Sequence, residues 1–266
     1  MNRLSVAGFT NLGYRLHSRA FEPIAADMSG KTVVVTGASD GLGKETTRSL
    51  ARLGARVIGV GRNPVRLAAL ESEVTGDVVA IQADLSLMTD VRDLAHHLLA
   101  TEPHIDVLVN NVGVLLPERT VTEEGLETTL ATNLAGHFLL TNLLLPRLIQ
   151  SSPARIVNVS SGGMYAERIR PDDLQYERDP YRGSSAYART KRGQVILTEL
   201  WAERLAGTGV VVHAMHPGWA QTAGVERSLP TFNKLMKPLL RTAAQGADTM
   251  IWLAAADEPG DSTGRF

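Results

Sequence analysis

Apolar residues along this chain come mainly in short, unbroken runs that are rich in β-branched side chains. Continuous runs of this kind are typical of strands covered on both faces, as in a parallel sheet. They predict six strands, at residues 31–37, 55–61, 77–84, 105–111, 154–161 and 210–218. The segments between them predict helices near residues 42–53, 64–74, 87–101, 124–150, 185–206 and 243–256. This alternation indicates an α/β fold with a doubly wound parallel sheet and right-handed crossovers.

The strand–helix alternation begins at Lys31, and the chain before it has a different pattern. We therefore expect an N-terminal helical appendage at residues 1–29 and a single domain at residues 30–266. The apolar residues of the appendage can share one helix face: Leu4, Phe9, Leu12 and Leu16. We expect this face to pack on the body of the protein or on a partner subunit. Peripheral membrane contact stays open as an alternative, which the arginines and glycines of the segment weaken.

Composition and charge exclude several function classes. The 266 residues carry a formal net charge of -1, so the electrostatic footprint of a nucleic-acid-binding protein is missing. Cysteine is absent, which excludes disulfides, thiolate metal sites and a cysteine nucleophile. His96 and His97 are adjacent and would point apart on a helix, and we expect no metal site. No apolar run approaches the ~18 residues that a membrane-spanning helix needs, which favours a cytoplasmic protein without a transmembrane segment.

The first predicted strand runs into the first predicted helix through a glycine-rich turn, TGASDGLG at residues 36–43. Glycines there let the backbone bend tightly and approach a pyrophosphate, which the N–H groups and dipole of the helix N-terminus then hold. An ordinary glycine-rich turn is the simpler alternative, but this position favours a nucleotide. The cofactor-binding residues predicted in the turn are Gly37, Ser39, Asp40, Gly41, Leu42 and Gly43.

The second predicted strand ends at Arg62, with no acidic residue beside it. A carboxylate at this place would bind the ribose 2′-hydroxyl of NAD and repel a 2′-phosphate. The guanidinium of Arg62 suits a phosphate instead, and Lys44 could add a second positive charge. The alternative is that Arg62 is a solvated loop residue. The sequence thus predicts NADP(H) as cofactor, with NAD(H) left open.

Tyr187 and Lys191 stand four residues apart in the segment SSAYARTKR, so on a helix both side chains leave the same face. A phenol is a poor acid near neutral pH, with an unperturbed pKa of about 10. A nearby cation favours the phenolate and lowers that pKa. The pair therefore predicts a proton donor, although this spacing is common and indicates catalysis only together with other motifs.

The spacing TGxxxGxG and the motifs that follow it, over residues 31–222, resemble the short-chain dehydrogenase/reductase family. The later motifs are NNVG, an asparagine in LATNLAG, the serine that closes RIVNVSS, the Tyr-x-x-x-Lys pair and PGxxxT. The resemblance implies a Rossmann-like fold and the catalytic residues Asn133, Ser161, Tyr187 and Lys191. It also implies cofactor contacts from Asp84, Leu85, Asn111, Gly113, Tyr187, Lys191, Pro217, Gly218 and Thr222. Ser160 is the alternative to Ser161, which the family pattern favours.

Within the family, the segments VSSGGM, MHPGWAQT and AQGADTMIWLA are similar to the retinol-dehydrogenase-like branch. We expect an NADP(H)-dependent oxidoreductase that transfers a hydride between nicotinamide and a small apolar aldehyde, ketone or secondary alcohol. One alternative is a non-catalytic redox sensor or scaffold that binds NADP(H). Another is an epimerase or dehydratase with tightly held NAD. The resemblance also implies a homo-oligomer.

Two stretches are expected to shape the substrate site. An insertion between Ser161 and Tyr187 has the composition of a loop over a pocket. Its larger side chains are Met164, Tyr165, Tyr176 and Tyr181. The second stretch, residues 223–241, lies where the family keeps a mobile lid and has an apolar side opposite basic residues. It is expected to be a lid over an apolar pocket, a face that touches a membrane, or a helix packed on the core.

Overall fold

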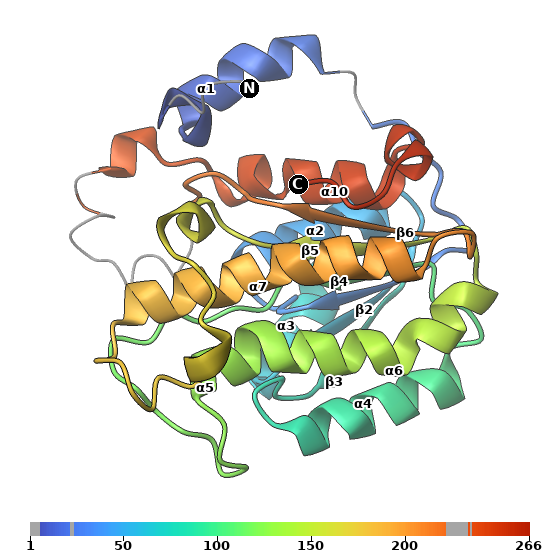
Figure 1. Cartoon of the computed structure of the whole chain (residues 1–266). Coiled ribbons are helices and arrows are strands. Elements are labelled where there is room, and N and C mark those ends of the chain that lie inside the picture. Colours follow the sequence, from blue (N-terminus) through green and yellow to red (C-terminus); the bar gives the residue numbers. More distant parts are fainter. Residues whose placement is uncertain (1–5, 22–23, 222–233, 235) are drawn as a thin grey trace.

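The computed structural model describes residues 6–21, 24–221, 234 and 236–266. At its centre is a six-stranded sheet with the order β3-β2-β1-β4-β5-β6, in which every neighbouring pair is parallel (Figure 1). The strands are β1 Thr32–Thr36, β2 Arg56–Gly61, β3 Val78–Gln82, β4 Val107–Asn110, β5 Ala154–Val159 and β6 Val210–Met215. All six apolar runs are strands, which confirms the predicted α/β fold.

Helices cover both faces of this sheet (Figure 1). The helices are α1 Asn11–His17, α2 Gly41–Arg52, α3 Pro64–Glu73, α4 Met88–Thr101, α5 Thr128–Leu130, α6 Gly136–Gln150, α7 Gly183–Arg204 and α10 Ala243–Ala255. Of these, α1 lies outside α10 and does not touch the sheet (Figure 1). Two apolar clusters mark the two faces, one beneath α4, α6 and α7 and the other beneath α2, α3 and α10. Val34 and Val35 of β1 belong to different clusters, because successive side chains leave a strand in opposite directions.

The strand order reverses at β1, which pairs with β2 on one side and with β4 on the other. Connections from the two halves of the sheet therefore run away from each other at this point. A crevice opens outside the carboxyl ends of such strands, and ligands of doubly wound folds bind there. The turn after β1 and the loop after β4 are thus the first places to look for a site.

The predicted helix at residues 124–150 begins later than expected and is interrupted. The carboxylate of Glu127 accepts hydrogen bonds from the N–H groups of Thr129 and Leu130, at 2.9 and 2.7 Å, and so caps the helix. Residues Ala131–Ala135 then form a π-helical turn before α6 begins. Such turns are rare and are frequent at functional sites, and this one carries Asn133.

The appendage meets the body through a face other than the predicted one. Leu12 and Leu16 of α1 are 55% and 59% exposed, so they do not form a packed face. Phe9 stacks on His216 instead, with ring centroids 4.7 Å apart. Gly13 is the buried residue of α1, because its missing side chain lets the helix approach the body closely. Packing on the body is therefore as predicted, and among the described residues of the proposed apolar face Phe9 provides it.

Two further sequence predictions lie partly outside the described residues. These are Leu4 of the appendage and most of the expected lid at 223–241, of which the structure describes residue 234 and residues 236–241. Within the described parts of the chain, no helix is both long enough and apolar enough to cross a membrane.

The insertion before α7 contains two short 3₁₀ turns, Gly162–Ala166 and Pro171–Asp173, and the first of them packs on that helix. Met164 and Tyr176 are buried, whereas Tyr165 is exposed. The ring of Tyr176 lies under the guanidinium of Arg189 of α7, 4.2 Å from ring centroid to the central carbon. The insertion is thus partly a packed element, and only part of it faces solvent.

Candidate active site

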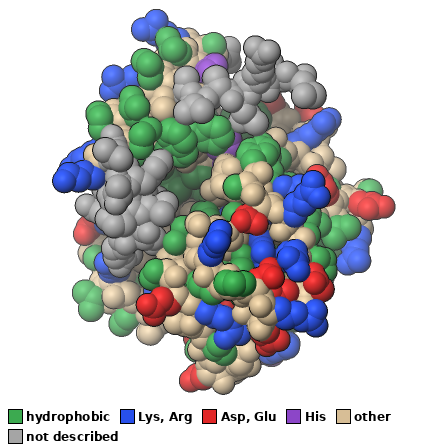
Figure 2. Space-filling model, turned by 60° about the vertical axis from the view of Figure 1, so that its left-hand side comes forward, with side chains coloured by type: hydrophobic (Ala, Val, Ile, Leu, Met, Phe, Trp, Pro, Cys, Tyr) green, Lys and Arg blue, Asp and Glu red, His purple; other side chains and the backbone are tan. Residues whose placement is uncertain are grey.

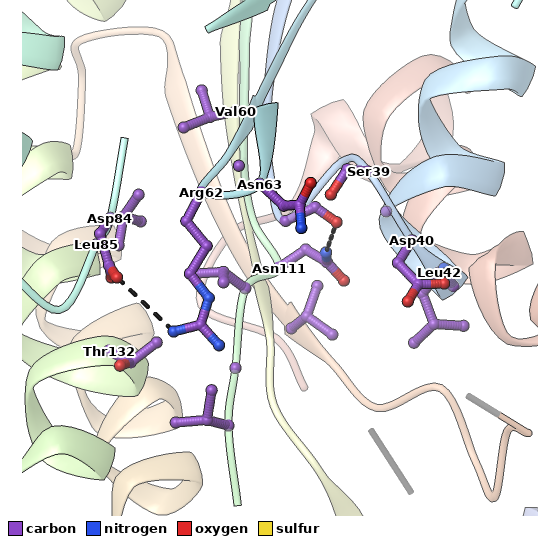
Figure 3. A pocket seen from close by; sticks show the side chains of 18 of the residues that line it. Ser39, Asp40, Leu42, Val60, Arg62, Asn63, Asp84, Leu85, Asn111 and Thr132 are labelled. Carbon is purple, nitrogen blue, oxygen red and sulfur yellow. Dashed lines mark hydrogen bonds and ion pairs between the residues drawn. The ribbon is translucent and has the colours of Figure 1, made fainter. Parts of the chain in front are cut away.

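A cavity of about 400 Å³ opens at the carboxyl ends of the central strands (Figure 3). Its walls come from the turn after β1, the ends of β2 and β3, the loop after β4, and α7. The predicted cofactor residues that line it are Gly37, Ser39, Asp40, Gly41, Leu42, Gly43, Arg62, Asp84, Leu85, Asn111, Gly113, Tyr187, Lys191 and Pro217. Gly218 is not among the lining residues, and Thr222 lies outside the described residues.

The turn after β1 requires glycine at three places. Gly37 and Gly41 have φ angles of 68° and 52°, in the left-handed region that other residues adopt only at a cost. A Cβ on Gly43 would lie 2.1 Å from the carbonyl oxygen of Gly37, so no side chain fits there. Asp40 caps α2 by accepting from the Gly41 N–H at 2.8 Å. The remaining N–H groups of the first turn have no partner within the helix, so the residues present fit a diphosphate.

Asn111 ties this turn to the end of β4. Its side-chain amide donates to the carbonyl oxygens of Thr36 and Gly37, at 2.8 and 3.3 Å. Its backbone N–H donates to the hydroxyl of Thr36 at 2.9 Å. Figure 3 shows the Asn111 side chain beside the turn. Asn111 therefore holds the shape of the glycine-rich turn, whether or not it also touches the cofactor.

Two arginines lie at the end of the cavity beyond β2. The side chain of Arg62 is 67% exposed and lies 3.7 Å from the carboxylate of Asp84 (Figure 3). Arg66, which the sequence reasoning missed, lines the same cavity and donates to Asp40 at 2.8 Å. The signal for it was Asn63, whose side chain caps α3 by accepting from the Arg66 N–H and so places Arg66 in the first helical turn.

The other charges near this end are already engaged. Lys44 does not line the cavity but pairs with Glu73 at 2.6 Å, so the second charge expected from it comes from elsewhere. One carboxylate oxygen of Asp84 accepts from the backbone N–H and the hydroxyl of Ser86, at 2.9 and 2.8 Å. The other oxygen faces Arg62. The carboxylate is thus held at the rim of the cavity by two hydrogen bonds from Ser86 and an ion pair with Arg62.

Tyr187 and Lys191 lie on one face of α7 at the opposite end of the cavity. The ammonium nitrogen of Lys191 is 5.5 Å from the centroid of the Tyr187 ring. Lys191 is 2% exposed and donates to the carbonyl of Val159 at 2.8 Å and to the side-chain oxygen of Gln194 at 3.1 Å. A Cβ on Gly113 would lie 3.2 Å from this ammonium, so the glycine keeps the lysine open to the cavity.

Burial changes the acidity of both groups, and for the phenol the direction differs from the sequence expectation. Burial raises the pKa of Tyr187, and a hydrogen bond with Ser161 opposes the rise. Burial also lowers the pKa of Lys191 to about 7. Both side chains occupy the same desolvated place, so neither charged form is favoured there. Without a ligand, Tyr187 is consequently in its protonated form at neutral pH, the form that a proton donor needs.

Ser160 and Ser161 follow β5 and point in different directions. The hydroxyl of Ser160 is buried and donates to the backbone carbonyl of Lys191 at 2.7 Å. The hydroxyl of Ser161 accepts from the N–H of Gly163 at 3.1 Å and hydrogen-bonds the phenol of Tyr187. Ser160 lines the cavity, but its hydroxyl is already engaged with the helix. Ser161 is therefore the serine whose hydroxyl the structure brings to Tyr187.

Asn133 is fully buried in the π-helical turn and joins three segments. Its side-chain oxygen accepts from the N–H of Val114 at 2.8 Å, and its amide nitrogen donates to the carbonyl of Val114 at 2.9 Å. The same nitrogen donates to the hydroxyl of Thr190 on α7 at 3.1 Å. The amide thus pairs with the loop after β4 as a neighbouring strand would, and links that loop to α7.

Sequence reasoning also missed a polar chain behind the lysine. Gln194 accepts from Lys191 with its side-chain oxygen, which turns its amide nitrogen towards His137, 2.8 Å from Nδ1. His137 is 1% exposed, and burial lowers its pKa to about 3. The imidazole is therefore neutral and accepts the hydrogen bond at Nδ1. The helical spacing of Lys191 and Gln194 could have suggested their contact, but nothing in the sequence pointed to His137.

Residues 31–231 match the family model described as short chain dehydrogenase. The chain belongs to the short-chain dehydrogenase/reductase family. It is 37% identical to dehydrogenase/reductase SDR family member 12 of Bos taurus over 255 residues, which cover 93% of this chain and 80% of that protein. It is 41% identical to retinol dehydrogenase 12 of Bos taurus over 244 residues, which cover 89% of this chain and 77% of that protein.

Solved structures of other proteins have the same fold as this short-chain dehydrogenase/reductase. An uncharacterised protein from Mycobacterium paratuberculosis is 34% identical and superposes with a TM-score of 0.75, covering 90% of this chain and 81% of that one. A protein from Beutenbergia cavernae, described as an NAD(P)-dependent gluconate 5-dehydrogenase and solved with bound NADP, is 26% identical with a TM-score of 0.74. That match covers 90% of this chain and 94% of the other. The protein is thus an NAD(P)-dependent oxidoreductase.

Proposed function

We propose that this protein is an NADP(H)-dependent oxidoreductase that interconverts apolar aldehydes or ketones and the corresponding alcohols. The observation that carries the proposal is that Tyr187 and Lys191 line one end of the cavity, where Ser161 hydrogen-bonds the phenol of Tyr187, and that the glycine-rich turn lines the other end. Cofactor and proton donor would then share one space, as hydride transfer with protonation requires.

Each residue has a definite part in the reductive direction. When bound, the nicotinamide supplies the hydride to the carbonyl carbon. Tyr187 donates its phenolic proton to the carbonyl oxygen as that oxygen gains charge. Ser161 hydrogen-bonds the same oxygen and stabilises the charge. Lys191 would hold the nicotinamide ribose, and its ammonium stabilises the phenolate that Tyr187 leaves behind.

The preference for NADP(H) rests on the arginines at the other end of the cavity. Arg62 and Arg66 both line it, and no carboxylate stands at the end of β2 to repel a 2′-phosphate. Their present partners, Asp84 and Asp40, are partly exposed, so a phosphate can compete for the guanidinium groups. The solved relative with bound NADP agrees with this preference.

The apolar substrate class is supported by the relatives and by the surroundings of Ser161. One relative named above is a retinol dehydrogenase, and retinol is a long apolar alcohol. Beyond Ser161, the aromatic side chains of Phe9, Trp219 and Phe266 lie near one another around His216. Such surfaces bind apolar bodies and leave the single polar group of the substrate to the catalytic residues.

The decisive experiment compares the parent with Tyr187→Phe. We expect the variant to lose NADPH-dependent reduction of apolar aldehydes by about 100-fold or more, because the proton donor is gone. Its NADPH affinity, followed by the fluorescence of the bound nucleotide, should change little. Tyr181→Phe is the matched control, since it removes a tyrosine hydroxyl that bonds Thr129 at 3.1 Å and does not line the cavity. A Tyr187→Phe variant that turns over at the parent rate would show that the phenol is not the acid.

A further inference from the structure

The first described residues of the appendage are fixed to the body through their backbone. Three consecutive carbonyls each accept a hydrogen bond. Arg241 donates to Gly8 at 2.7 Å and to Thr10 at 3.4 Å, and the N–H of Trp219 donates to Phe9 at 2.8 Å. Figure 1 shows the N-terminal segment lying along α10 at the edge of the molecule. The position of Phe9 is therefore set by the catalytic body and not by the free appendage.

These contacts place the Phe9 ring between two loops. On one side a Cβ on Gly162 would lie 2.4 Å from a ring carbon of Phe9, so the ring occupies the space that a side chain there would fill. On the other side the ring stacks on His216 and Trp219, with centroids 4.7 and 5.8 Å apart. Phe9 keeps part of its surface open to solvent.

Both loops belong to the active site. Gly162 directly follows Ser161, whose hydroxyl bonds Tyr187. His216 directly precedes Pro217, which lines the cofactor cavity. Phe9 itself is not among the residues that line that cavity. The ring therefore lies against the residue that follows Ser161, outside the lining of the cofactor cavity.

The aromatic surface continues beyond Phe9. Phe266 lies 5.7 Å from His216, and Tyr165 lies 6.1 Å from Phe266, measured between ring centroids. Tyr165 and Phe266 are both exposed. Figure 2 brings forward the side of the molecule on which α7 begins, and hydrophobic side chains gather in the upper part of that view, beside a hollow. A row of rings next to a proton donor suits a flat or extended apolar molecule.

We infer that Phe9, which the N-terminal appendage supplies, is a specificity-determining residue of the substrate site. Its ring forms an apolar wall against which the body of the substrate packs while Ser161 and Tyr187 bind the oxygen. The substrate class is an aromatic or conjugated apolar aldehyde, ketone or alcohol. The inference rests on the proposed function for its chemistry, but the position of the ring is independent of it.

The test compares cinnamaldehyde with propanal as substrates of the parent and of Phe9→Ala, with NADPH consumption as the readout. We expect the ratio of kcat/KM for cinnamaldehyde to that for propanal to fall about tenfold, because an aromatic contact is lost only for the larger aldehyde. Leu12→Ala is the matched control, since Leu12 is an exposed residue of the same appendage, and it should keep the parent ratio. An unchanged ratio in Phe9→Ala would overturn the inference.

A second variant separates recognition from anchoring. Phe9→Leu keeps an apolar side chain against Gly162 and His216 but removes the aromatic face, and we expect the ratio to fall about threefold. Loosening of the appendage alone would lower thermal stability in Phe9→Ala without moving the substrate ratio in Phe9→Leu. A loss of thermal stability in Phe9→Ala together with an unchanged ratio of kcat/KM values in Phe9→Leu would also count against the inference.

Binding without turnover keeps this inference distinct from the proposed function. Cinnamyl alcohol is titrated calorimetrically into the protein loaded with NADPH, a pair that cannot react. If the parent reduces neither aldehyde, the proposed function fails, and about tenfold weaker alcohol binding by Phe9→Ala still supports the role of Phe9. Equal binding of cinnamyl alcohol by the parent and Phe9→Ala, or no binding by the parent, overturns the inference about Phe9.

Discussion

At the scale of single residues, the far end of the cavity is defined by two guanidinium groups. Arg62 and Arg66 each face a carboxylate across the rim, Asp84 and Asp40, and the ion pairs are exposed enough to contribute little to stability. We expect these arginines to act mainly by binding a phosphate of the ligand. A planar cation pairs with a phosphate through two parallel hydrogen bonds, which a ribose hydroxyl cannot do.

Replacing Arg62 should therefore change the choice of cofactor. We expect Arg62→Ala to weaken NADPH binding about tenfold or more, since one charge-assisted hydrogen bond is worth about 1.5–3 kcal/mol, and to leave NADH binding nearly unchanged. Titration of both nucleotides by fluorescence measures this. Lys44→Ala is the control, because Lys44 pairs with Glu73 outside the cavity. Equal losses for the two nucleotides would mean that Arg62 does not read the 2′-phosphate.

At the scale of elements, the π-helical turn between α5 and α6 sets the distance between the loop after β4 and α7. The turn brings Asn133 level with Val114, and two hydrogen bonds join them as in a strand pair. A third hydrogen bond reaches Thr190, one residue before Lys191. The asparagine thus has a structural part, because it joins the loop after β4 to α7.

Removal of this amide should cost stability as well as activity. Asn133→Ala leaves the partly buried N–H and carbonyl of Val114 without their partner, and we expect the free energy of unfolding to fall by about 2 kcal/mol. Urea denaturation followed by circular dichroism measures the loss. Asn142→Ala on α6 is the control, because its amide donates only to the carbonyl of Phe138 in the same helix. A loss no greater than that of the control would contradict the structural role.

The outer faces of α6 and α7 carry exposed apolar side chains. Phe138 and Leu200 are 44% and 42% exposed, and Phe138 stacks on Trp201 of the neighbouring helix. An apolar face of this kind is what a twofold interface would bury. The homo-oligomer implied by the family resemblance stays a prediction, as does the cytoplasmic location.

At the scale of the whole molecule, buried histidines tie stability to pH. Burial lowers the pKa of His137 to about 3 and that of His216 to about 4, against an ordinary value of 6.5. Below pH 6.5 these two histidines become protonated in the unfolded chain but stay neutral in the folded protein. The unfolded state then binds more protons, so stability falls as the pH drops from 6.5 towards these lowered values.

A His137→Gln variant tests this coupling. Each histidine that stays neutral only in the folded state makes the free energy of unfolding fall by about 1.4 kcal/mol per pH unit. Between pH 6.5 and 5 the variant should therefore lose less stability than the parent. Thermal unfolding across that range gives the slopes. His97→Gln, an exposed histidine on α4, controls for the loss of a histidine as such. Parallel slopes for the parent and His137→Gln would contradict the assignment.

The sequence by itself determined the features that depend on a few neighbouring residues. The six strands follow from the unbroken apolar runs, and the glycine-rich turn follows from the glycines between the first strand and the first helix. Tyr187 and Lys191 share a face because helical geometry places them there. The start of the helix at Thr128 was missed because it depends on Glu127 as a cap.

Only the tertiary structure decided what depends on burial and on contacts between distant segments. It turned the expected fall in the Tyr187 pKa into a rise, because desolvation by burial outweighs the lowering effect of the hydrogen bond with Ser161. It also brought Phe9 beside Gly162, the residue after Ser161, and joined His137 to Lys191 through Gln194. Periodicity describes one element at a time, whereas these contacts exist only after the elements have packed.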